Sequence, residues 1–484
     1  MSVLEMLKPQ RVFYYFEEIC RIPHGSGNTR EISDYLAGFA REQGLAFVQD
    51  EKNNVVIYKE AFPGYEEAPT VILQGHMDMV CEKRPDVEHD FTRDGLKLSV
   101  TEDGYVTANG TTLGGDDGIA VAYILAILES RDIPHPALEA VITVDEEIGL
   151  LGAAALDCSV LKGRRLINID SEEEGSLLVG CAGGMCGECV IPVKRMDAEG
   201  MICQVRITGL AGGHSGGEID KNRANANILM GRFLYRLKKE MGFGLLELFG
   251  GTKDNAITRE CQAVIMADEE ELETLERLAR ETEEELQREY AGSDEGIRIQ
   301  VTREEVRCAS ILHPTSMEKT LFFLMNVPWG VAKMSGTAAG LVETSSNLGV
   351  LRLCQEALEA VVSIRSSIGS ASKALSQRVE YLTEFLGGEY EVSGAYPAWE
   401  YRKDSPLRDC MVRVYEEVYG EKPEVTVIHA GLECGLFYEK MEGLDCVSVG
   451  PDIVDIHTSE ERLSITSTER VWNYLLKVLE ALKD

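Results

Sequence analysis

The sequence lacks an apolar run of the roughly 20 residues that a membrane-spanning helix needs. Basic residues are also scarce: 48 Lys and Arg stand against 82 Asp and Glu, which gives a formal net charge of −34. A nucleic-acid partner or an anionic membrane surface would require a basic face, so this balance argues against both. The amino-terminal stretch lacks the basic start and apolar core of a secretory signal. We therefore expect a soluble cytoplasmic protein.

The 13 cysteines are scattered and odd in number, which is typical of reduced thiols in the cytosol. One dense patch, CAGGMCGEC, contains Cys181, Cys186 and Cys189. A structural zinc or iron–sulfur site needs a fourth ligand at a recognisable spacing, and the neighbouring sequence offers none. We interpret the three as ordinary small residues of a folded core. A thiol enzyme built on this patch is an alternative that thiol alkylation would test.

With 484 residues, of which 44 % are hydrophobic, the chain is long enough for two or three globular domains. Up to about residue 180, short runs rich in Val and Ile alternate with helical patterns, as they do in an α/β layer. The pattern predicts helices near Leu4–Arg21 and Gly118–Glu129. It predicts buried strands at Val55–Tyr58, Val71–Leu73, Ala140–Val144 and Leu166–Ile169.

The pattern changes at residue 186 to longer strands and longer amphipathic helices, such as the helix expected at Asn222–Lys239. After residue 391 the α/β alternation returns, with a helix at Pro406–Tyr419 and a strand at Asp445–Val449. We therefore predict an α/β fold. A catalytic domain with a mainly parallel central sheet flanked by helices would be formed by residues 1–185 and 392–484, and residues 186–391 would form an inserted α+β lid domain.

Acidic and imidazole side chains follow the predicted strands or begin a helix, where ligands collect in open α/β sheets. The motifs are QGHMDMV, LGGDDG, VDEEIG, INIDSEE and DIHTSEER. His76 and Asp78 are two apart, so on an extended backbone both project to one face. Each motif alone has an ordinary explanation, such as helix capping by Asp116 and Asp117 or a solvated loop at Glu146 and Glu147. Together they supply the histidines and carboxylates that a pair of divalent metals requires.

These motifs resemble those of the dinuclear-metal dipeptidases, most closely the cytoplasmic aminoacyl-histidine dipeptidases. The resemblance covers essentially the whole chain and includes GGHSGGEI, GGTKDNAI, SIRSS and HAGLECG in the same order. It implies hydrolysis of dipeptides, of the Xaa-His type with broad specificity, by a water bridged between two divalent metals. Zinc is the expected metal, and manganese and cobalt are alternatives.

The resemblance also implies a role for each residue of the metal centre. His76 and Asp170 would ligate the first metal, and Glu147 and His457 the second. Asp116 would bridge the two. Glu146 would be the general base, and Asp78 would orient His76. Asp117 has no ligand role that we can assign, so helix capping is its best interpretation.

The motifs GGHSGGEI, GGTKDNAI and SIRSS of the inserted domain, and HAGLECG beyond it, would supply the remaining contacts. By the same resemblance, His214 would stabilise the oxyanion, Asn255 would contact polar groups of the substrate, and Arg365 and Gly431 would hold its terminal carboxylate. A homodimer formed through this domain is also implied, in which His214 could serve its own or the neighbouring subunit. The role of Glu433 stays open. Rival functions are a tripeptidase, aminoacylase or carboxypeptidase of the same chemistry, or a non-catalytic binding protein with a relic site.

Overall fold

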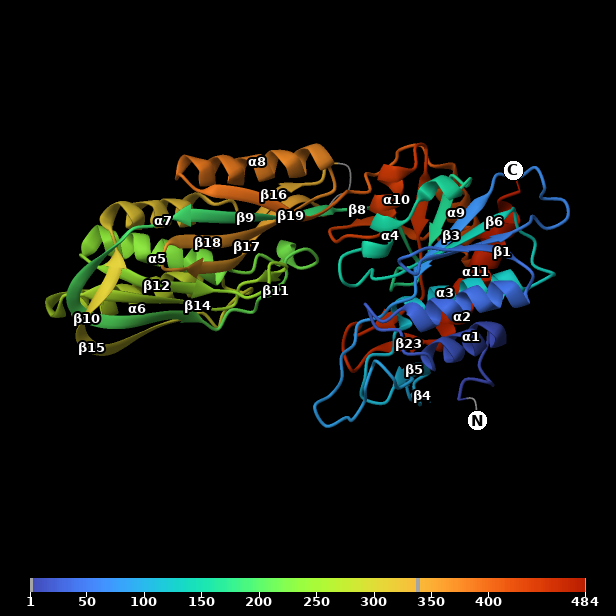
Figure 1. Cartoon of the computed structure of the whole chain (residues 1–484), viewed down its shortest axis with the longest axis horizontal. Helices are drawn as coiled ribbons and strands as arrows, with labels where there is room; N and C mark the ends of the chain where they lie inside the picture. The colour runs from blue at the N-terminus through green and yellow to red at the C-terminus, as the bar shows by residue number, and fades with distance from the viewer. Residues whose placement is uncertain (1–2, 337–339, 484) are drawn as a thin grey trace. The chain divides into compact units, whose positions relative to one another are not determined.

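The computed structural model describes residues 3–336 and 340–483, and the chain divides into two compact units (Figure 1). The first unit contains Met1–Cys181, Tyr401–Val427 and Leu432–Asp484, and the second contains Ala182–Glu400 and Ile428–Gly431. The expected boundaries at residues 185 and 391 fall inside strands β9 (Gly183–Pro192) and β19 (Glu389–Tyr396). These two strands pair with each other in the second unit, so the chain crosses between units outside them.

A mixed sheet forms the centre of the first unit and confirms the predicted α/β class. Its four central strands run parallel, and the strand on either side of these four pairs antiparallel with them. Val- and Ile-rich segments form these central strands because both of their faces are covered. The sheet order is β1 (Ala46–Gln49), β2 (Val55–Lys59), β6 (Leu138–Thr143), β3 (Val71–His76), β7 (Arg165–Asn168), β21 (Asp445–Ser448), β8 (Ser176–Cys181) and β20 (Glu424–Ile428).

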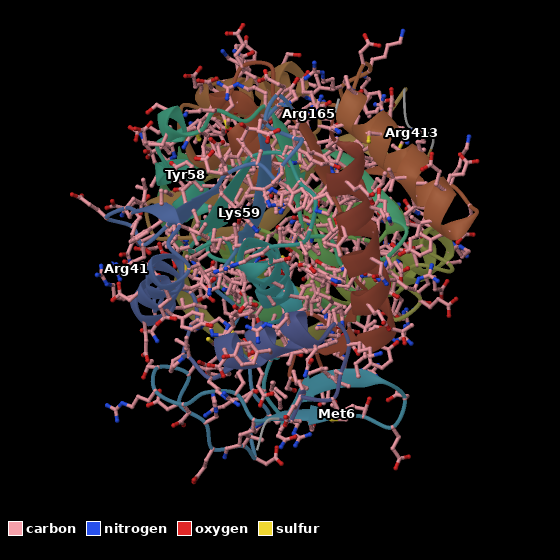
Figure 2. All side chains as sticks on the ribbon, turned by 90° about the vertical axis from the view of Figure 1, so that its right-hand side faces the viewer. Met6, Arg41, Tyr58, Lys59, Arg165 and Arg413 are labelled. Atoms are coloured by element: carbon pink, nitrogen blue, oxygen red, sulfur yellow. The ribbon has the colours of Figure 1, made fainter. Side chains whose placement is uncertain are left out.

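Helices flank this sheet, and α3 (Gly115–Glu129) is buried on almost every side. It packs against β3 and against α1 (Gln10–Cys20). At its carboxyl end, Lys59 of β2, which is labelled in Figure 2, donates through Nζ to the carbonyls of Ile127, at 2.8 Å, and Ser130, at 2.6 Å. A cation at this end satisfies free carbonyls and fixes the helix against the sheet. The other helices are α2 (Arg30–Glu42), α4 (Leu151–Ala155), α9 (Pro406–Tyr419), α10 (Cys434–Lys440) and α11 (Ile465–Ala481).

A small antiparallel sheet completes the first unit and holds the turn between residues 454 and 462, which connects two of its strands. Its order is β22 (Ile453–Val454), β23 (Arg462–Ser464), β5 (Tyr105–Ala108) and β4 (Leu98–Val100). Among the residues that the structure describes, no helix is long and apolar enough to cross a membrane.

The second unit is an antiparallel sheet with helices packed on it. Its sheet order is β15 (Arg298–Leu312), β10 (Arg195–Thr208), β14 (Cys261–Ala267), β12 (Gly244–Gly250), β17 (Val342–Leu353), β18 (Ala357–Ser366), β9 and β19, and β16 (Gly330–Met334) pairs with β17. β11 (Gly213–His214) and β13 (Ala256–Ile257) form a separate short pair. The helices are α5 (Ala226–Glu240), α6 (Leu272–Glu289), α7 (Pro314–Asn326) and α8 (Gly369–Phe385).

Candidate metal centre

The central strands of the first unit bring the expected side chains to one edge of the sheet. His76 is the last residue of β3, Glu146 and Glu147 follow β6, and Asp170 follows β7. Because these three strands are adjacent and parallel, their carboxyl ends lie side by side. Asp116 reaches the same place from the first turn of α3, where its φ of −82° and ψ of 105° are not helical.

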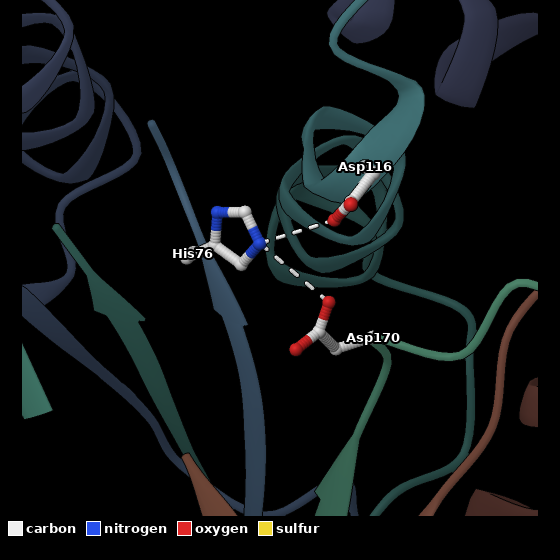
Figure 3. A group of neighbouring side chains, drawn as sticks. All are labelled: His76, Asp116 and Asp170. Carbon is white, nitrogen blue, oxygen red and sulfur yellow. Dashed lines mark hydrogen bonds and ion pairs between the residues drawn. The ribbon is translucent and has the colours of Figure 1, made fainter. Parts of the chain in front are cut away.

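His76 contacts two carboxylates at this edge (Figure 3). Its Nε2 lies 3.2 Å from Asp116 Oδ1 and 3.5 Å from Asp170 Oδ1, and its side chain is 1 % exposed. One ligand atom of each of the three residues lies within 4.8 Å of the others, a spacing that suits one metal ion. The other ring nitrogen, Nδ1, lies 2.9 Å from the main-chain carbonyl of Asp78, which holds the ring in orientation.

A second group of ligand atoms shares Asp116. His457 Nε2 lies 3.1 Å from Asp116 Oδ2 and 3.1 Å from Glu147 Oε1. Asp116 therefore directs one oxygen toward each histidine, as a carboxylate that bridges two ions must do. Two imidazoles and three carboxylates at these spacings fit a pair of divalent cations.

The electrostatics of the cluster also favour a cation. Burial raises the pKa of Asp170 to about 6, and the nearby carboxylates of Asp116 and Glu147 act in the same direction. Burial likewise raises the pKa of Glu146 well above its ordinary value, with contributions from Asp170 and Glu147. Hydrogen bonds with Asp116 and Glu147 raise the pKa of His457 to about 11. These carboxylates thus repel one another in a buried place, and positive charge would stabilise their ionised forms.

Asp78 connects the histidine to the neighbouring acidic loop. Its buried carboxylate accepts from Ser26 Oγ at 2.8 Å and from the main-chain N–H of Glu146 at 3.1 Å, and it lies 3.5 Å from His76 Nδ1. Asp78 therefore fixes the start of the Glu146–Glu147 loop as well as the imidazole. One atom of each of His76, Glu146 and Glu147 also lies within 4.8 Å of the others, so proximity alone does not separate the two glutamates.

The interpretation of Asp117 as a helix cap is wrong. Its buried carboxylate accepts from the main-chain N–H of His76 at 3.1 Å, so it ties α3 to the end of β3. The residue that precedes the helix is Gly114, which has a left-handed φ of 66° and no side chain to cap with.

Glu433 is likewise buried, and its carboxylate accepts from Gln74 Nε2 and Thr143 Oγ1 beneath the cluster. Burial raises the pKa of Glu433 to about 7.

In the second unit, the structure brings His214 and Asn255 together. His214 in β11 pairs with Ala256 in β13, and the carbonyl of Asn255 accepts from the main-chain N–H of Ser215 at 2.8 Å. Both His214 and Asn255 are exposed. His214 Nδ1 accepts the main-chain N–H groups of Gly216 and Gly217, at 3.3 and 3.1 Å. A neutral imidazole that accepts at Nδ1 carries its proton on Nε2, so His214 presents a donor.

Arg365 and Gly431 share a neighbour, Tyr396, that the sequence analysis did not identify. Arg365 of β18 is 8 % exposed and donates through Nη1 to Tyr396 Oη at 2.8 Å. A Cβ on Gly431 would lie 2.6 Å from the Tyr396 ring, so the tyrosine requires glycine there.

The sequence analysis also did not identify His429, whose Nε2 lies 2.7 Å from Ser345 Oγ. Burial and the nearby Arg365 lower the pKa of His429 to about 4.

The cysteine patch lies in strands of the two units. Cys181 ends β8, and Cys186 and Cys189 belong to β9. Cys181 and Cys189 are buried, whereas Cys186 is half-buried and its thiol donates to Asp254 Oδ2 at 2.9 Å. Burial and the Asp254 carboxylate raise the pKa of Cys186 to about 12, which disfavours the thiolate that nucleophilic chemistry needs.

Comparisons with known proteins identify the family of this chain. The family described as "Peptidase family M20/M25/M40" matches residues 72–481. The chain is 36 % identical to the cytosol non-specific dipeptidase of Escherichia coli K12, over 100 % of this chain and 99 % of that protein. It is 38 % identical to the aminoacylhistidine dipeptidase of Vibrio alginolyticus, whose crystal structure matches with a TM-score of 0.90 over 99 % of this chain and 98 % of that one. The aminopeptidase PepT of Bacillus cereus, 16 % identical with a TM-score of 0.56 over 99 % of this chain and 100 % of that one, shares the fold. The chain therefore belongs to peptidase family M20/M25/M40 and is a hydrolase.

Proposed function

We propose that this peptidase hydrolyses dipeptides, including the Xaa-His type, with two divalent metal ions, of which zinc is the first choice and manganese or cobalt the alternatives. The observation that carries the proposal is the position of Asp116, with one oxygen toward His76 and the other toward His457. His76, Asp116 and Asp170 would hold one ion, and Asp116, Glu147 and His457 the other. The names of the two full-length relatives support a dipeptide substrate.

When bound, the two ions would lower the pKa of a water molecule and polarise the scissile carbonyl. Glu146 would accept the proton of that water and later deliver it to the leaving amine. Its raised pKa, caused first by burial, suits a group that must hold a proton between these steps. His214 would donate from Nε2 to the developing oxyanion, and its two Nδ1 hydrogen bonds keep that proton in place.

Arg365 would bind the terminal carboxylate of the substrate. The guanidinium is buried, Tyr396 occupies its Nη1, and its Nε has no partner among the described residues. Gly431, which packs against the Tyr396 ring, would present its main chain to the same carboxylate, and Asn255 would contact other polar groups. A carboxylate clamp favours a short peptide with a free carboxyl end, although a tripeptidase, an aminoacylase or a carboxypeptidase would use related contacts.

We further propose that the protein is cytoplasmic and forms a homodimer through the second unit. The name of the Escherichia coli relative supports the first point. The second is supported by apolar side chains that α7 and α8 expose, among them Phe322, Met325, Tyr381 and Phe385. The last two are 72 % and 70 % exposed, which is costly for large aromatic surfaces in water. Light scattering of the purified protein tests this association.

A paired measurement of metal content and substrate turnover tests the main proposal. We expect about two divalent ions per chain, loss of activity on chelation, and recovery with zinc, manganese or cobalt. On a panel of Xaa-His dipeptides, other dipeptides, tripeptides and N-acyl amino acids, dipeptides should have the highest kcat/KM. Full activity without metal after exhaustive chelation would end the metal hypothesis. Preference for tripeptides or N-acyl amino acids would favour a rival, and no hydrolysis with metal restored would favour a relic site.

A further inference from the structure

The buried carboxylate of Glu461 binds the main chain of the segment that carries Asp116. Its Oε2 accepts from the N–H groups of Leu113, at 2.7 Å, and Gly114, at 3.1 Å. Its Oε1 accepts from Gly115, at 2.8 Å, and more weakly from Asp116, at 3.4 Å. Glu461 is 2 % exposed. One carboxylate thus accepts from the N–H groups of residues 113–116, which lead into α3 and form its first two residues.

This loop needs an external acceptor. N–H groups at the start of a helix have no partner within the helix, and here no side chain of the helix's own first turn caps them. Gly114 is left-handed and Asp116 is extended, so the segment has no regular hydrogen-bond pattern to hold its direction. A Cβ on Gly115 would lie 3.2 Å from Glu461 Oε1, which shows how closely the carboxylate and the loop approach.

Hydrogen bonds and strand pairing hold the backbone at Glu461 itself. Its carbonyl accepts from Thr107 Oγ1 at 3.0 Å, and its N–H donates to the carbonyl of Thr458 at 3.2 Å. The next residue, Arg462, begins β23 and pairs with Thr107 of β5. His457 lies in the same turn. The turn that contains His457 and Glu461 therefore contacts Asp116 in two places. The His457 imidazole lies beside the Asp116 carboxylate, and the Glu461 carboxylate accepts from the Asp116 main-chain N–H.

We propose that Glu461 is a positioning residue for the metal centre: by fixing the main chain of residues 113–116, it directs the two oxygens of Asp116 toward His76 and His457. The inference rests on the proposed function insofar as Asp116 is a metal ligand. Among the described residues, Glu461 belongs to none of the groups of candidate ligand atoms, and its carboxylate accepts from the main chain of residues 113–116 instead. Its removal should weaken metal binding because a bridging carboxylate with a loose backbone must be ordered when the ions bind.

Glu139 offers a matched control. It is also 2 % exposed and lies in β6 of the same unit, and its carboxylate accepts from the main-chain N–H groups of Lys162, at 2.8 Å, and Gly163, at 3.0 Å. It stands near the amino end of β6, whereas the metal cluster follows the carboxyl end. Glu139→Gln and Glu461→Gln both replace a buried carboxylate that accepts main-chain hydrogen bonds, but only the second is connected to Asp116.

The experiment is a titration of the folded apoproteins with Zn²⁺ against a competing chelator, with circular dichroism to confirm the fold. We expect Glu461→Gln to raise the Kd for zinc about 10–100-fold, and Glu139→Gln to bind zinc as the unaltered protein does. If Glu461→Gln fails to fold, Glu461→Asp should still raise the Kd, because the shorter side chain reaches fewer of the N–H groups, but by less, because it keeps the carboxylate. Normal zinc affinity in a folded Glu461 variant, or an equal loss of affinity in Glu139→Gln, overturns this inference and leaves the proposed function intact. No zinc binding by the unaltered protein overturns the proposed function and this inference with it.

Discussion

Glu146 and Glu147 are adjacent and chemically identical, yet the geometry predicts opposite consequences when each is replaced by glutamine. Glu147 Oε1 lies 3.1 Å from His457 Nε2, within the group that would hold the second ion. The Glu146 backbone is fixed by Asp78, and the pKa of its carboxyl is raised, first by burial. We predict that Glu146→Gln keeps both metals and binds substrate but lowers kcat by about 10²–10⁴-fold, or about 3–5 kcal/mol of activation free energy.

Glu147→Gln should instead lower the metal content. An amide carries no charge to offset a divalent ion, so occupancy of one site should fall and excess metal should restore part of the activity. The assay is metal analysis of dialysed protein together with kcat at several metal concentrations, for both variants and the unaltered protein. If Glu146→Gln loses metal while Glu147→Gln retains it, the two roles are reversed. If both variants lose metal equally, the division of labour between them is wrong.

Two further predictions concern the second unit. Arg365→Lys should lower kcat/KM on free dipeptides about 10–150-fold, because an ammonium cannot replace a bidentate contact worth about 1.5–3 kcal/mol, and should change little on C-terminal amides; equal losses on both would mean that Arg365 has a structural role. His429 has a folded-state pKa of about 4 against an ordinary 6.5, so its neutral form contributes stability that is complete above pH 6.5 and is lost as the pH falls toward 4, about 3 kcal/mol in all. His429→Gln should make the free energy of unfolding, measured with urea, depend less steeply on pH between 4 and 6.5. An unchanged pH dependence would contradict the lowered pKa of His429.

Local sequence signals predicted most of the elements well. Helix Pro406–Tyr419 has the predicted bounds because Pro406 follows the capping Ser405. The sequence analysis missed helices α2 and α7, although α7 has similar signals in Pro314 and in His313, which accepts from Thr315. The predicted parallel sheet is confined to four central strands, since the strands on either side pair antiparallel.

The meeting of the candidate metal ligands at one edge of the sheet was predictable for a different reason. Strands that run parallel must end at one edge, so acidic residues after β3, β6 and β7 could be expected to meet. Glu461 could not be found in this way. It lies within a charged SEER run that is typical of a solvated turn, and its partners at residues 113–116 are about 350 positions away in the chain. Tyr396 and His429 likewise acquire their significance only from Arg365, which lies in a different strand.

The two acidic pairs show where local reasoning ends. In each pair, neighbours with the same side chain face different surroundings because the backbone between them is irregular. Asp116 is extended at the start of α3, so its carboxylate reaches the histidines while Asp117 turns back to the N–H of His76. Asp116 and Asp117 have the same charge and the same helix propensity, so tertiary contacts distinguish them. Glu461 accepts from the main chain of Asp116, whereas the Asp117 carboxylate accepts from the end of β3. Several such motifs taken together therefore predict a site, and only the contacts of each backbone predict which member of an acidic pair acts in it.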